Sequence, residues 1–598
     1  MARPVDPLAP YRVSLHVTNG YTYANTQPAY TDPDTGKIKH RCVHWGRLGD
    51  NLQFIPGFEY YNASPEERRK LVFPPEWDLS LIDQLATPAG QNKPNLECCR
   101  ECRNLLYGDV WLIEQIAEKT GLREDLEIVF DGNSEAVSDV LTLAMFPYLT
   151  KYTYNRVARW QLITKAPSSR LLTPSVITKF TQSITERHRM ELLKLRAARM
   201  SENELCAVDS TSRSAYGDEL ADIRWGKNKD QLPLAQTNDV VVYSLSNHMP
   251  VYYRQFAGNT PDSRSLDIIL SDLDGAGFKN PVLITDRGYD TLHTLDKYIS
   301  RGQPFITCAI TSHKLVASEI RAMGDFGVRP ENMQLDPDER IFYKQYDLSY
   351  AVKGSKPGDK APDRLKLNLY FDIVRRSYEL LDLELDISSQ GGDLEGCLNN
   401  KTVMEDIGKI KRDCRYYSVK ADSNGCIESY ALDEKKVAKA RSLSGFFANI
   451  THGLDYDAME AYRIYHLRDE QEKYFQQMKD QMVSDRQRNW SEEGKTGRNF
   501  ILFSALIISS HVRYIWRSTK LHEKFKTSLD ILDQMRPIRM VENVGQPQII
   551  TPFIGSQVDI CEAFGFAIPD GCAPIAVAQR NLGRKRGRPR KQLPESSN

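Results

Sequence analysis

One segment near residue 470 has a spacing that favours a helix with two different faces. Four polar residues stand at offsets of 0, 3, 7 and 14, namely Tyr465, Arg468, Glu472 and Lys479. At about 100° per residue their side chains fall within an arc of about 60°. The apolar residues of the segment form the adjacent stripe. One face is therefore expected to pack, while the other presents a carboxylate between cations, which suits a site that holds metal and phosphate.

Two aspartates stand at the ends of short apolar runs. Residues 205–208 lead into Asp209, and residues 282–284 lead through Thr285 into Asp286. Such runs, closed by a turn signal, are typical of buried strands, and ligands of open α/β sheets bind beyond the carboxyl ends of strands. An aspartate before Ser or Thr is more often a turn or helix cap when it stands alone. Together, the two are expected at one edge of a sheet.

The helix pattern Y-x2-R-x3-E-x6-K resembles the Y-R-E-K signature of bacterial insertion-sequence DDE transposases of the IS-four-like branch. With Glu472, the aspartates resemble the DDE triad of that family, Asp209 in a D-S/T context and Asp286 in T-D-R-G-Y. Further blocks resemble the family over most of residues 10–530, at residues 226–230, 250–251, 256–260 and 497–501.

The resemblance implies an α/β fold in which an RNase H-like catalytic domain is interrupted by a β-rich insertion. Asp209 and Asp286 are 77 residues apart, whereas Asp286 and Glu472 are 186 residues apart, too many for one crossover. We expect a mixed α+β N-terminal domain with a possible role in DNA-end binding, the two parts of the catalytic core flanking the insertion, and a C-terminal tail, at residues 1–165, 166–309, 310–445, 446–540 and 541–598.

Three carboxylates suit phosphodiester cleavage in their own right, because two Mg²⁺ ions about 4 Å apart can activate a nucleophile and stabilise the leaving oxygen. Mg²⁺ prefers a few carboxylates with water and phosphate oxygens, and Mn²⁺ is expected to substitute. Asp209 would bridge both ions, with Asp286 and Glu472 each completing one. Arg468 and Lys479 would grip phosphates, and Tyr465 would pack or hydrogen-bond there.

The sequence thus favours a DNA transposase that acts on double-stranded DNA, at element ends and target, as a homodimer. Two alternatives stay open, an RNase H-like nuclease without strand transfer and a catalytically silent, transposase-derived DNA-binding protein. The intact carboxylates argue against the silent protein. A hairpin intermediate is in question, because the insertion lacks the tryptophan of some relatives, although Tyr or Phe can also stack on a base.

Composition sets limits on partners and compartment. The 598 residues are enough for three or four domains, and 79 Lys and Arg balance 79 Asp and Glu, so any DNA surface must be local. The longest apolar run, residues 500–508, predicts a buried helix rather than a membrane span. With no apolar signal core and an odd number of cysteines, the chain is expected in the cytoplasm, nucleoid-associated. Zinc at Cys98, Cys99 and Cys102 is less favoured than reduced thiols.

The basic C-terminal tail contains an R-G-R-P core that resembles an AT-hook. Proline keeps the backbone extended, glycine allows close approach to the groove floor, and arginines fit the narrow minor groove of A·T-rich DNA. A generic polyanion-binding tail is the alternative. The expected DNA contacts of this tail are Arg586, Gly587, Arg588, Pro589 and Arg590.

Four further segments carry local expectations. Residues 11–17 predict a strand, and residues 32–36 a turn that closes a hairpin. Residues 112–122 have helix-turn-helix spacing, but the acidic residues that follow favour two packed helices over a DNA reader. Residues 184–200 predict a basic helix, solvated or placed at the rim of a nuclease site. Alternation at residues 365–373 and 381–386 predicts strands with one wet face.

Overall fold

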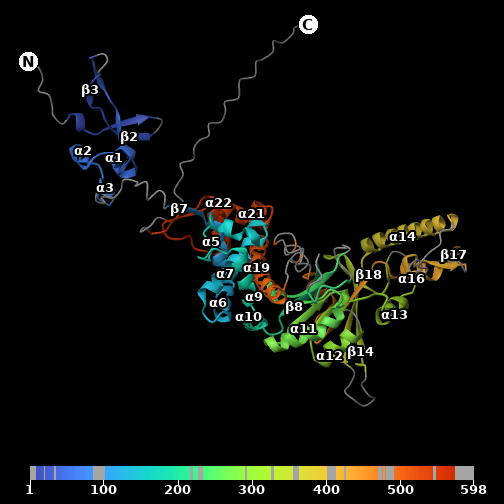
Figure 1. The fold of residues 1–598 in the computed structure, drawn as a ribbon. Coiled ribbons are helices and arrows are strands. Elements are labelled where there is room, and N and C mark those ends of the chain that lie inside the picture. The colour runs from blue at the N-terminus through green and yellow to red at the C-terminus, as the bar shows by residue number, and fades with distance from the viewer. Residues whose placement is uncertain are drawn as a thin grey trace, which may run out of the picture. The chain divides into compact units, whose positions relative to one another are not determined.

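The computed structural model describes residues 9–18, 21–32, 36–84, 102–215, 220–226, 234–289, 292–324, 329–353, 363–400, 412–422, 426–468, 475, 479, 482, 491–542 and 547–572. The chain divides into two compact units (Figure 1). The first comprises Met1–Arg103 with Glu542–Gln548, and the second comprises Asn104–Val541 with Ile549–Asn598.

The first unit is built on an antiparallel sheet of four strands, in the order β1 (Ser14–Thr18), β2 (Tyr21–Thr26), β5 (Val43–Leu48), β6 (Phe54–Pro56). Aromatic packing of Phe54 with Tyr60, Phe73 and Trp77 forms its core. The expected hairpin is confirmed: β3 (Ala29–Thr31) pairs with β4 (Ile38–His40), and Gly36 at φ 65° closes the turn. Short helices complete the unit, α1 (Phe58–Asn62), α2 (Pro65–Lys70) and α3 (Ser80–Gln84).

Helices form one part of the second unit, around α19 (Glu492–Ser518). The apolar run at residues 500–508 is buried within α19, as expected. A Cβ on Gly497 would lie 2.0 Å from the carbonyl oxygen of Thr181, so only glycine allows this approach to α9. The neighbouring elements are β7 (Arg103–Leu106), α5 (Gly108–Lys119), α6 (Leu122–Val129), α7 (Ser134–Thr150), α8 (Val157–Gln161), α9 (Pro174–Ser183), α10 (Glu186–Ala198), α20 (Leu521–Lys524), α21 (Ser528–Met535), β19 (Arg539–Glu542), β20 (Ile549–Ile550) and α22 (Gly555–Phe564).

None of the described helices is both long enough and apolar enough to span a membrane.

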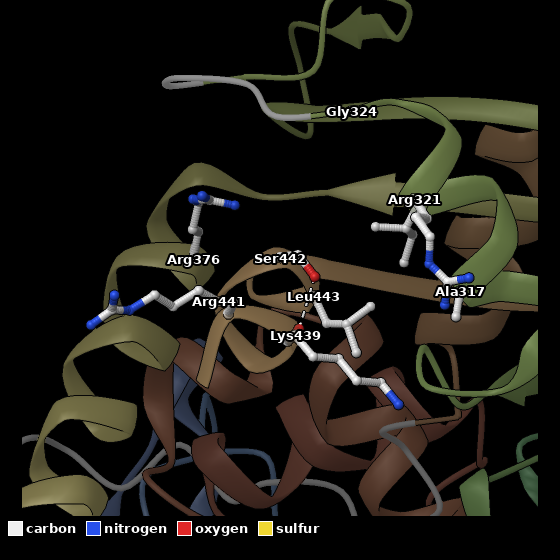
Figure 2. Close-up of a pocket in the computed structure, with 10 residues that line it drawn as sticks. Ala317, Arg321, Gly324, Arg376, Lys439, Arg441, Ser442 and Leu443 are labelled. Carbon is white, nitrogen blue, oxygen red and sulfur yellow. Dashed lines mark hydrogen bonds between the residues drawn. The ribbon is translucent and has the colours of Figure 1, made fainter. Parts of the chain in front are cut away.

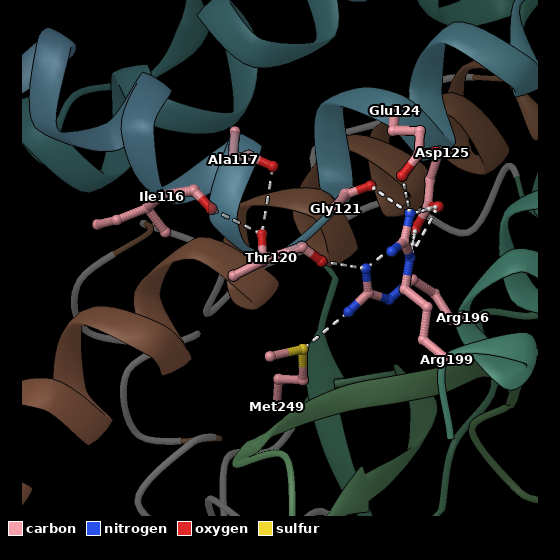
Figure 3. Close-up of polar contacts among 9 residues, drawn as sticks. All are labelled: Ile116, Ala117, Thr120, Gly121, Glu124, Asp125, Arg196, Arg199 and Met249. Carbon is pink, nitrogen blue, oxygen red and sulfur yellow. Dashed lines mark hydrogen bonds and ion pairs between the residues drawn. The ribbon is translucent and has the colours of Figure 1, made fainter. Parts of the chain in front are cut away.

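The two helices expected around residues 112–122 are α5 and α6, which pack on each other, and α6 packs against α10 through buried charges (Figure 3). Asp125 of α6 forms ion pairs with Arg196 at 3.0 Å and Arg199 at 2.7 Å. Arg189 of α10 is buried as well, and it pairs with Asp272 at 3.3 Å. The expectation of a solvated or DNA-tracking helix over residues 184–200 is therefore wrong for these buried arginines, because carboxylates of other elements bind them.

A nine-stranded sheet forms the other part of the second unit, in the order β10-β9-β8-β11-β12-β18-β15-β14-β13. Strands β8, β11 and β12 run parallel, whereas β9 and β10 on one side and β18, β15, β14 and β13 on the other continue the sheet antiparallel. The structure is thus mixed α/β. The strand bounds are β8 (Leu205–Ser214), β9 (Gln236–Ser244), β10 (Met249–Ala257), β11 (Val282–Thr285), β12 (Phe305–Ala309), β13 (Gln334–Asp336), β14 (Ile341–Tyr350), β15 (Asp363–Phe371) and β18 (Phe446–His452). Helices α11 (Asp262–Ala276) and α12 (Leu292–Ser300) lie alongside the sheet (Figure 1). Helix α17 (Ala458–His466) packs against β14, β15 and β18.

The chain between β12 and β18 contains helices as well as strands. Strands β13 to β15 extend the large sheet, and α13 (Lys314–Ala322), α14 (Ile373–Asn399), β16 (Tyr417–Ala421), β17 (Ile427–Leu432) and α16 (Glu434–Leu443) accompany them. The predicted strand at residues 365–373 is β15, but most of it is buried on both faces, so the expected wet face is wrong.

The predicted strand at residues 381–386 is wrong, because this stretch lies inside α14. Asp372 caps that helix by accepting hydrogen bonds from the backbone N–H groups of Val374 and Arg375. Leu383 and Leu394 are buried on α14, and their separation is close to three helical turns, so one face packs. The alternation of leucines and acidic residues fits the period of a strand. The Asp372 cap and the packed leucine face show that the segment is a helix.

Candidate active site

Asp209 lies within strand β8, not at its end. The sequence expectation that the strand stops before Asp209 is wrong, since β8 pairs with β9 from Cys206 to Ser214. The second half of β8 is polar, and it remains extended because neighbouring side chains bind its polar groups. Arg213, for example, forms an ion pair with Asp239 and donates a hydrogen bond of 2.8 Å to Oδ1 of Asn499. Asp209 is only 9 % exposed.

Asp286 follows directly after β11, as the sequence predicts. The parallel register pairs Val208 of β8 with Thr285 of β11, so Asp209 and Asp286 are the next residues of two adjacent strands. Directly opposite residues of neighbouring strands present their side chains on the same face. The chain then turns away through the short helix η4 (Arg287–Tyr289). The two predicted carboxylates are therefore neighbours at the carboxyl end of β11, beside the middle of β8.

Arg468 lies between the two carboxylates. Its Nη1 is 3.8 Å from Oδ2 of Asp209, and its Nη2 is 4.0 Å from Oδ1 of Asp286. The Arg468 side chain is 9 % exposed and the Asp286 side chain is 43 % exposed, so the site is buried on one side and open on the other. A cation at this position offsets the repulsion between two nearby carboxylates.

Tyr465 lies on the last turn of α17, which ends at His466. Arg468 therefore follows the helix in a turn, and the expectation that one continuous helix presents both residues is wrong at this point. The guanidinium carbon of Arg468 is 5.5 Å from the centre of the Tyr465 ring, a cation–π distance. Burial raises the pKa of Tyr465 well above its usual value, and the Cys308 thiol and Asp286 raise it further, while Arg468 opposes them. The phenol is therefore neutral at physiological pH and acts as a hydrogen-bonding and packing group.

A cavity of about 240 Å³ adjoins Tyr465. Its lining combines cations with aromatic rings, among them Arg287, Arg375, Tyr462, Tyr465 and Phe447. Arg287 directly follows Asp286, so the cavity and the carboxylates share one turn of the chain. Cationic and aromatic groups together suit a phosphate with an attached flat ring.

A third carboxylate near the pair, Asp262, escaped the sequence analysis. Its Oδ1 accepts a hydrogen bond of 2.7 Å from the hydroxyl of Ser210, the residue after Asp209. A Cβ on Gly288 would lie 2.7 Å from the other carboxylate oxygen. Burial raises the pKa of Tyr289 well above its usual range, and the charges of Asp262 and then Asp209 raise it further. The one sequence signal for Asp262 was its position, two residues after the family-like block at residues 256–260.

Two of the resembling sequence blocks meet in space. A Cβ on Gly226 would lie 2.0 Å from the carbonyl oxygen of Gly258, and a Cβ on Gly258 would lie 2.1 Å from the carbonyl oxygen of Gln236. The backbone N–H of Gly258 also donates to the carbonyl of Asp222 at 3.0 Å. These glycines are thus required for close backbone packing beside β9 and β10.

Several predicted residues cannot be placed. Glu472 lies outside the described residues, as do Cys98, Cys99 and the tail from Arg586 to Arg590. Lys479 is partly buried. In the described part of the chain, no group of three or more His, Cys, Asp or Glu residues is arranged to hold a metal ion.

Comparison with known proteins identifies a family. The family model described as "Transposase DDE domain" matches residues 201–508, which include both aspartates, Arg468 and Glu472. None of the curated proteins matches the chain. A cryo-EM structure of the piggyBac transposase synaptic complex with hairpin DNA is similar over 68 % of this chain and 70 % of that chain, with 6 % sequence identity and a TM-score of 0.34. A TM-score this low does not establish a common fold.

Proposed function

The chain belongs to the transposase DDE-domain family, and we propose that it is a DNA transposase of the IS-four-like insertion-sequence branch. In this proposal it cuts element ends by metal-dependent phosphodiester hydrolysis and joins the freed 3′-hydroxyl ends to target DNA. Asp209, Asp286 and Glu472 are the catalytic carboxylates, and Tyr465, Arg468 and Lys479 bind DNA near the cut.

One observation carries the proposal. Asp209 and Asp286 are far apart in sequence, yet the parallel register of β8 and β11 makes them neighbours, and Arg468 contacts both. An ordinary structural ion pair does not need two carboxylates from separate strands beside one arginine. This proximity of two predicted carboxylates and a residue of the Y-R-E-K pattern supports the proposal that they share one site.

The strand order supports an RNase H-like catalytic domain. Strands β10, β9 and β8 form an antiparallel meander, and β11 and β12 then add parallel to β8. We assign the catalytic core to residues 166–309 and 446–540 and the β-rich insertion to 310–445. Residues 1–165 would form an N-terminal domain with a possible role in DNA-end binding, and residues 541–598 a tail.

The chemistry of the donors fits a divalent cation. Adjacent carboxylate oxygens are hard ligands of the kind that Mg²⁺ prefers, and Mn²⁺ accepts the same set. Asp209 and Asp286 would hold the metal together with Glu472. When bound, the metal ions activate water and stabilise the leaving 3′-oxygen. Arg468 supplies positive charge to the same carboxylates and remains close enough to bind a phosphate.

Partners follow from the proposed reaction. The protein would bind double-stranded DNA at the element ends and at the target, as a homodimer that bridges two ends, associated with the nucleoid. The tail from Arg586 to Arg590 would add A·T-biased minor-groove affinity that weakens with salt.

The test uses the full chain with linear DNA that carries the sequences flanking its own gene, and Mg²⁺ or Mn²⁺. Asp209→Asn, Asp286→Asn and Glu472→Gln are compared with Asp267→Asn, an acid of α11 whose carboxylate is 52 % exposed and paired with Lys297. We expect end-specific cutting and joined products from the wild type and the control, and loss of at least 100-fold from the three site variants.

The outcomes separate the alternatives. Cutting without joined products identifies a nuclease that lacks strand transfer. Binding without metal-dependent cutting, equal in all proteins, identifies a silent DNA-binding derivative and rejects the proposed enzyme.

A further inference from the structure

A second cavity, of about 570 Å³, lies among helices described between β12 and β18 (Figure 2). Helices α13, α14 and α16 contribute its lining: Ala317, Ile320, Arg321, Gly324, Arg376, Ala438, Lys439, Arg441, Ser442 and Leu443. Four of these described residues are cations, and no described lining residue is acidic. The chain as a whole has equal numbers of acidic and basic residues, so this is a local concentration of charge.

The four cations differ in how far they are neutralised. Arg441 forms an exposed ion pair with Glu384 at 2.6 Å, and Arg376 donates to the carbonyl of Ser444 at 3.3 Å. Arg321 and Lys439 have no ion pair within the described residues. Figure 2 shows Arg321 at the right and the Lys439 side chain extending to the right below it, with Arg376 and Arg441 at the left. Like charges around a concave surface raise its positive potential and attract anions, which makes this cavity an anion site.

The lining also limits the kind of anion. None of the described lining residues is aromatic, so they offer a nucleobase nothing to stack on, and a free nucleotide would gain little binding energy from them. The neutral lining residues are small or aliphatic, including Ala317, Ile320 and Leu443. Cations above an apolar floor fit the phosphates and sugars of a DNA backbone, whose oxygens accept hydrogen bonds without presenting a base.

We propose that this cavity, defined by Arg321, Arg376, Lys439 and Arg441, binds the phosphate backbone of a DNA strand. It therefore forms a second DNA contact, built on elements other than those that hold Asp209 and Asp286. The proposal rests on the proposed function for its choice of DNA as partner, and it adds a binding surface that the catalytic residues do not supply.

The test measures DNA binding by the full chain in EDTA, where metal-dependent cutting cannot occur. The test variant, Arg321→Gln with Lys439→Gln, removes two exposed cations from the cavity. The matched control, Lys314→Gln with Lys435→Gln, removes two exposed cations from the same helices, α13 and α16, outside the lining. Affinity for an element-end duplex is measured between 50 and 250 mM KCl by fluorescence anisotropy.

Each phosphate contact contributes about 0.9 to the slope of log affinity against log salt. We expect the test variant to reduce this slope by about 1 to 2 and to weaken binding about tenfold at 100 mM salt, whereas the control remains near the wild type. Equal slopes for both variants would reject the cavity as a DNA contact. The effect would then come from the overall electrostatic field of the protein.

Two further arms separate the remaining explanations. Pyrophosphate is titrated into the wild type and the test variant by calorimetry. If the wild type binds it at micromolar concentration and the variant does not, while the salt slope for DNA is unchanged, the cavity is reassigned to a free phosphate compound. Metal-dependent cutting is assayed in parallel. A wild-type protein that shows the expected slope change but never cuts DNA would support the cavity and reject the transposase, so the two proposals fail separately.

Discussion

Asp209 and Asp286 lie side by side because each directly follows one member of the Val208–Thr285 register pair of two parallel strands. A register shift of one residue would move one carboxylate to the opposite face of the sheet. The site therefore depends on the apolar halves of β8 and β11, whose residues from Cys206 to Val208 and from Val282 to Ile284 are almost completely buried. Core packing fixes the position of the reactive groups.

Replacement of Arg468 should expose the repulsion that it offsets. We expect Arg468→Met to lower the free energy of unfolding by about 3 kcal/mol in EDTA, because two close carboxylates lose their shared cation. Divalent metal should recover part of this loss, so Mg²⁺ should raise the melting temperature more in the variant than in the wild type. Differential scanning calorimetry with and without Mg²⁺ measures both effects.

Arg463→Met is the matched control, since Arg463 belongs to the same stretch of chain but pairs with Asp336 and Glu339 at the surface. We expect a loss below about 1 kcal/mol and no added response to Mg²⁺. An equal response to Mg²⁺ in both variants would mean that Arg468 does not neutralise a metal-binding pair.

The hydrogen bond between Ser210 and Asp262 should position Asp209. Ser210→Ala and Asp262→Ala should each reduce the rate of metal-dependent DNA cutting by about tenfold, since each removes the same hydrogen bond beside Asp209. The double variant should be no slower than the slower single variant, because both changes break one contact. Cutting rates at several Mg²⁺ concentrations provide the double-mutant cycle. Fully additive effects would show that the two residues act independently.

Much of the site was readable from sequence. Short apolar runs before Asp209 and Asp286 predicted buried strands, and the Y-R-E-K pattern predicted a role for Tyr465 and Arg468, which lie beside these aspartates. The strand signals work because a buried strand needs consecutive apolar residues. The helical spacing of the Y-R-E-K pattern did not predict that α17 ends at His466, before Arg468. The family assignment of the chain agrees with them.

Other features depend on contacts between distant residues and left no local pattern. Asp262 approaches Ser210 only after α11 packs beside the sheet. The leucine-acid alternation at residues 381–386 fitted a strand, although the cap at Asp372 starts a helix there. The polar end of β8 looked like a turn because Asn499 and Asp239, which satisfy Arg213, are remote in sequence.

The buried charge cluster of Figure 3 should be sensitive to loss of one partner. Asp125 and Arg196 are 1 % and 3 % exposed. Asp125→Ala leaves the Arg196 charge buried without its carboxylate, and we expect it to lower the free energy of unfolding by about 3 to 5 kcal/mol. Glu124→Ala, which removes an exposed partner of Arg199, should change it by less than about 1 kcal/mol.

Urea denaturation measures these differences. Asp125→Leu combined with Arg196→Met should recover most of the loss, because an apolar pair of similar size leaves no buried charge. A double variant as unstable as Asp125→Ala alone would show that the loss arises from packing and not from the uncompensated arginine.

His511 should make the stability of the second unit depend on pH. Burial, with a smaller contribution from Lys119, lowers the pKa of His511 from an ordinary value of 6.5 to about 4. Between these values the unfolded chain binds a proton that the folded chain does not, so stability decreases as the pH falls from 6.5 towards 4. The decrease attributable to this residue should be about 2 kcal/mol at pH 4.5.

Urea denaturation at pH 7.5 and pH 4.5 tests this, with His511→Leu as the variant and His522→Gln, at an exposed histidine of α20, as the control. His511 lies 6.3 Å from the ring of Phe564, so a leucine keeps an apolar contact there. The difference in unfolding free energy between the two pH values should shrink by about 2 kcal/mol in His511→Leu and remain as in the wild type for His522→Gln. An unchanged difference in His511→Leu would mean that the imidazole titrates normally in the folded protein, and other groups would then account for any acid sensitivity.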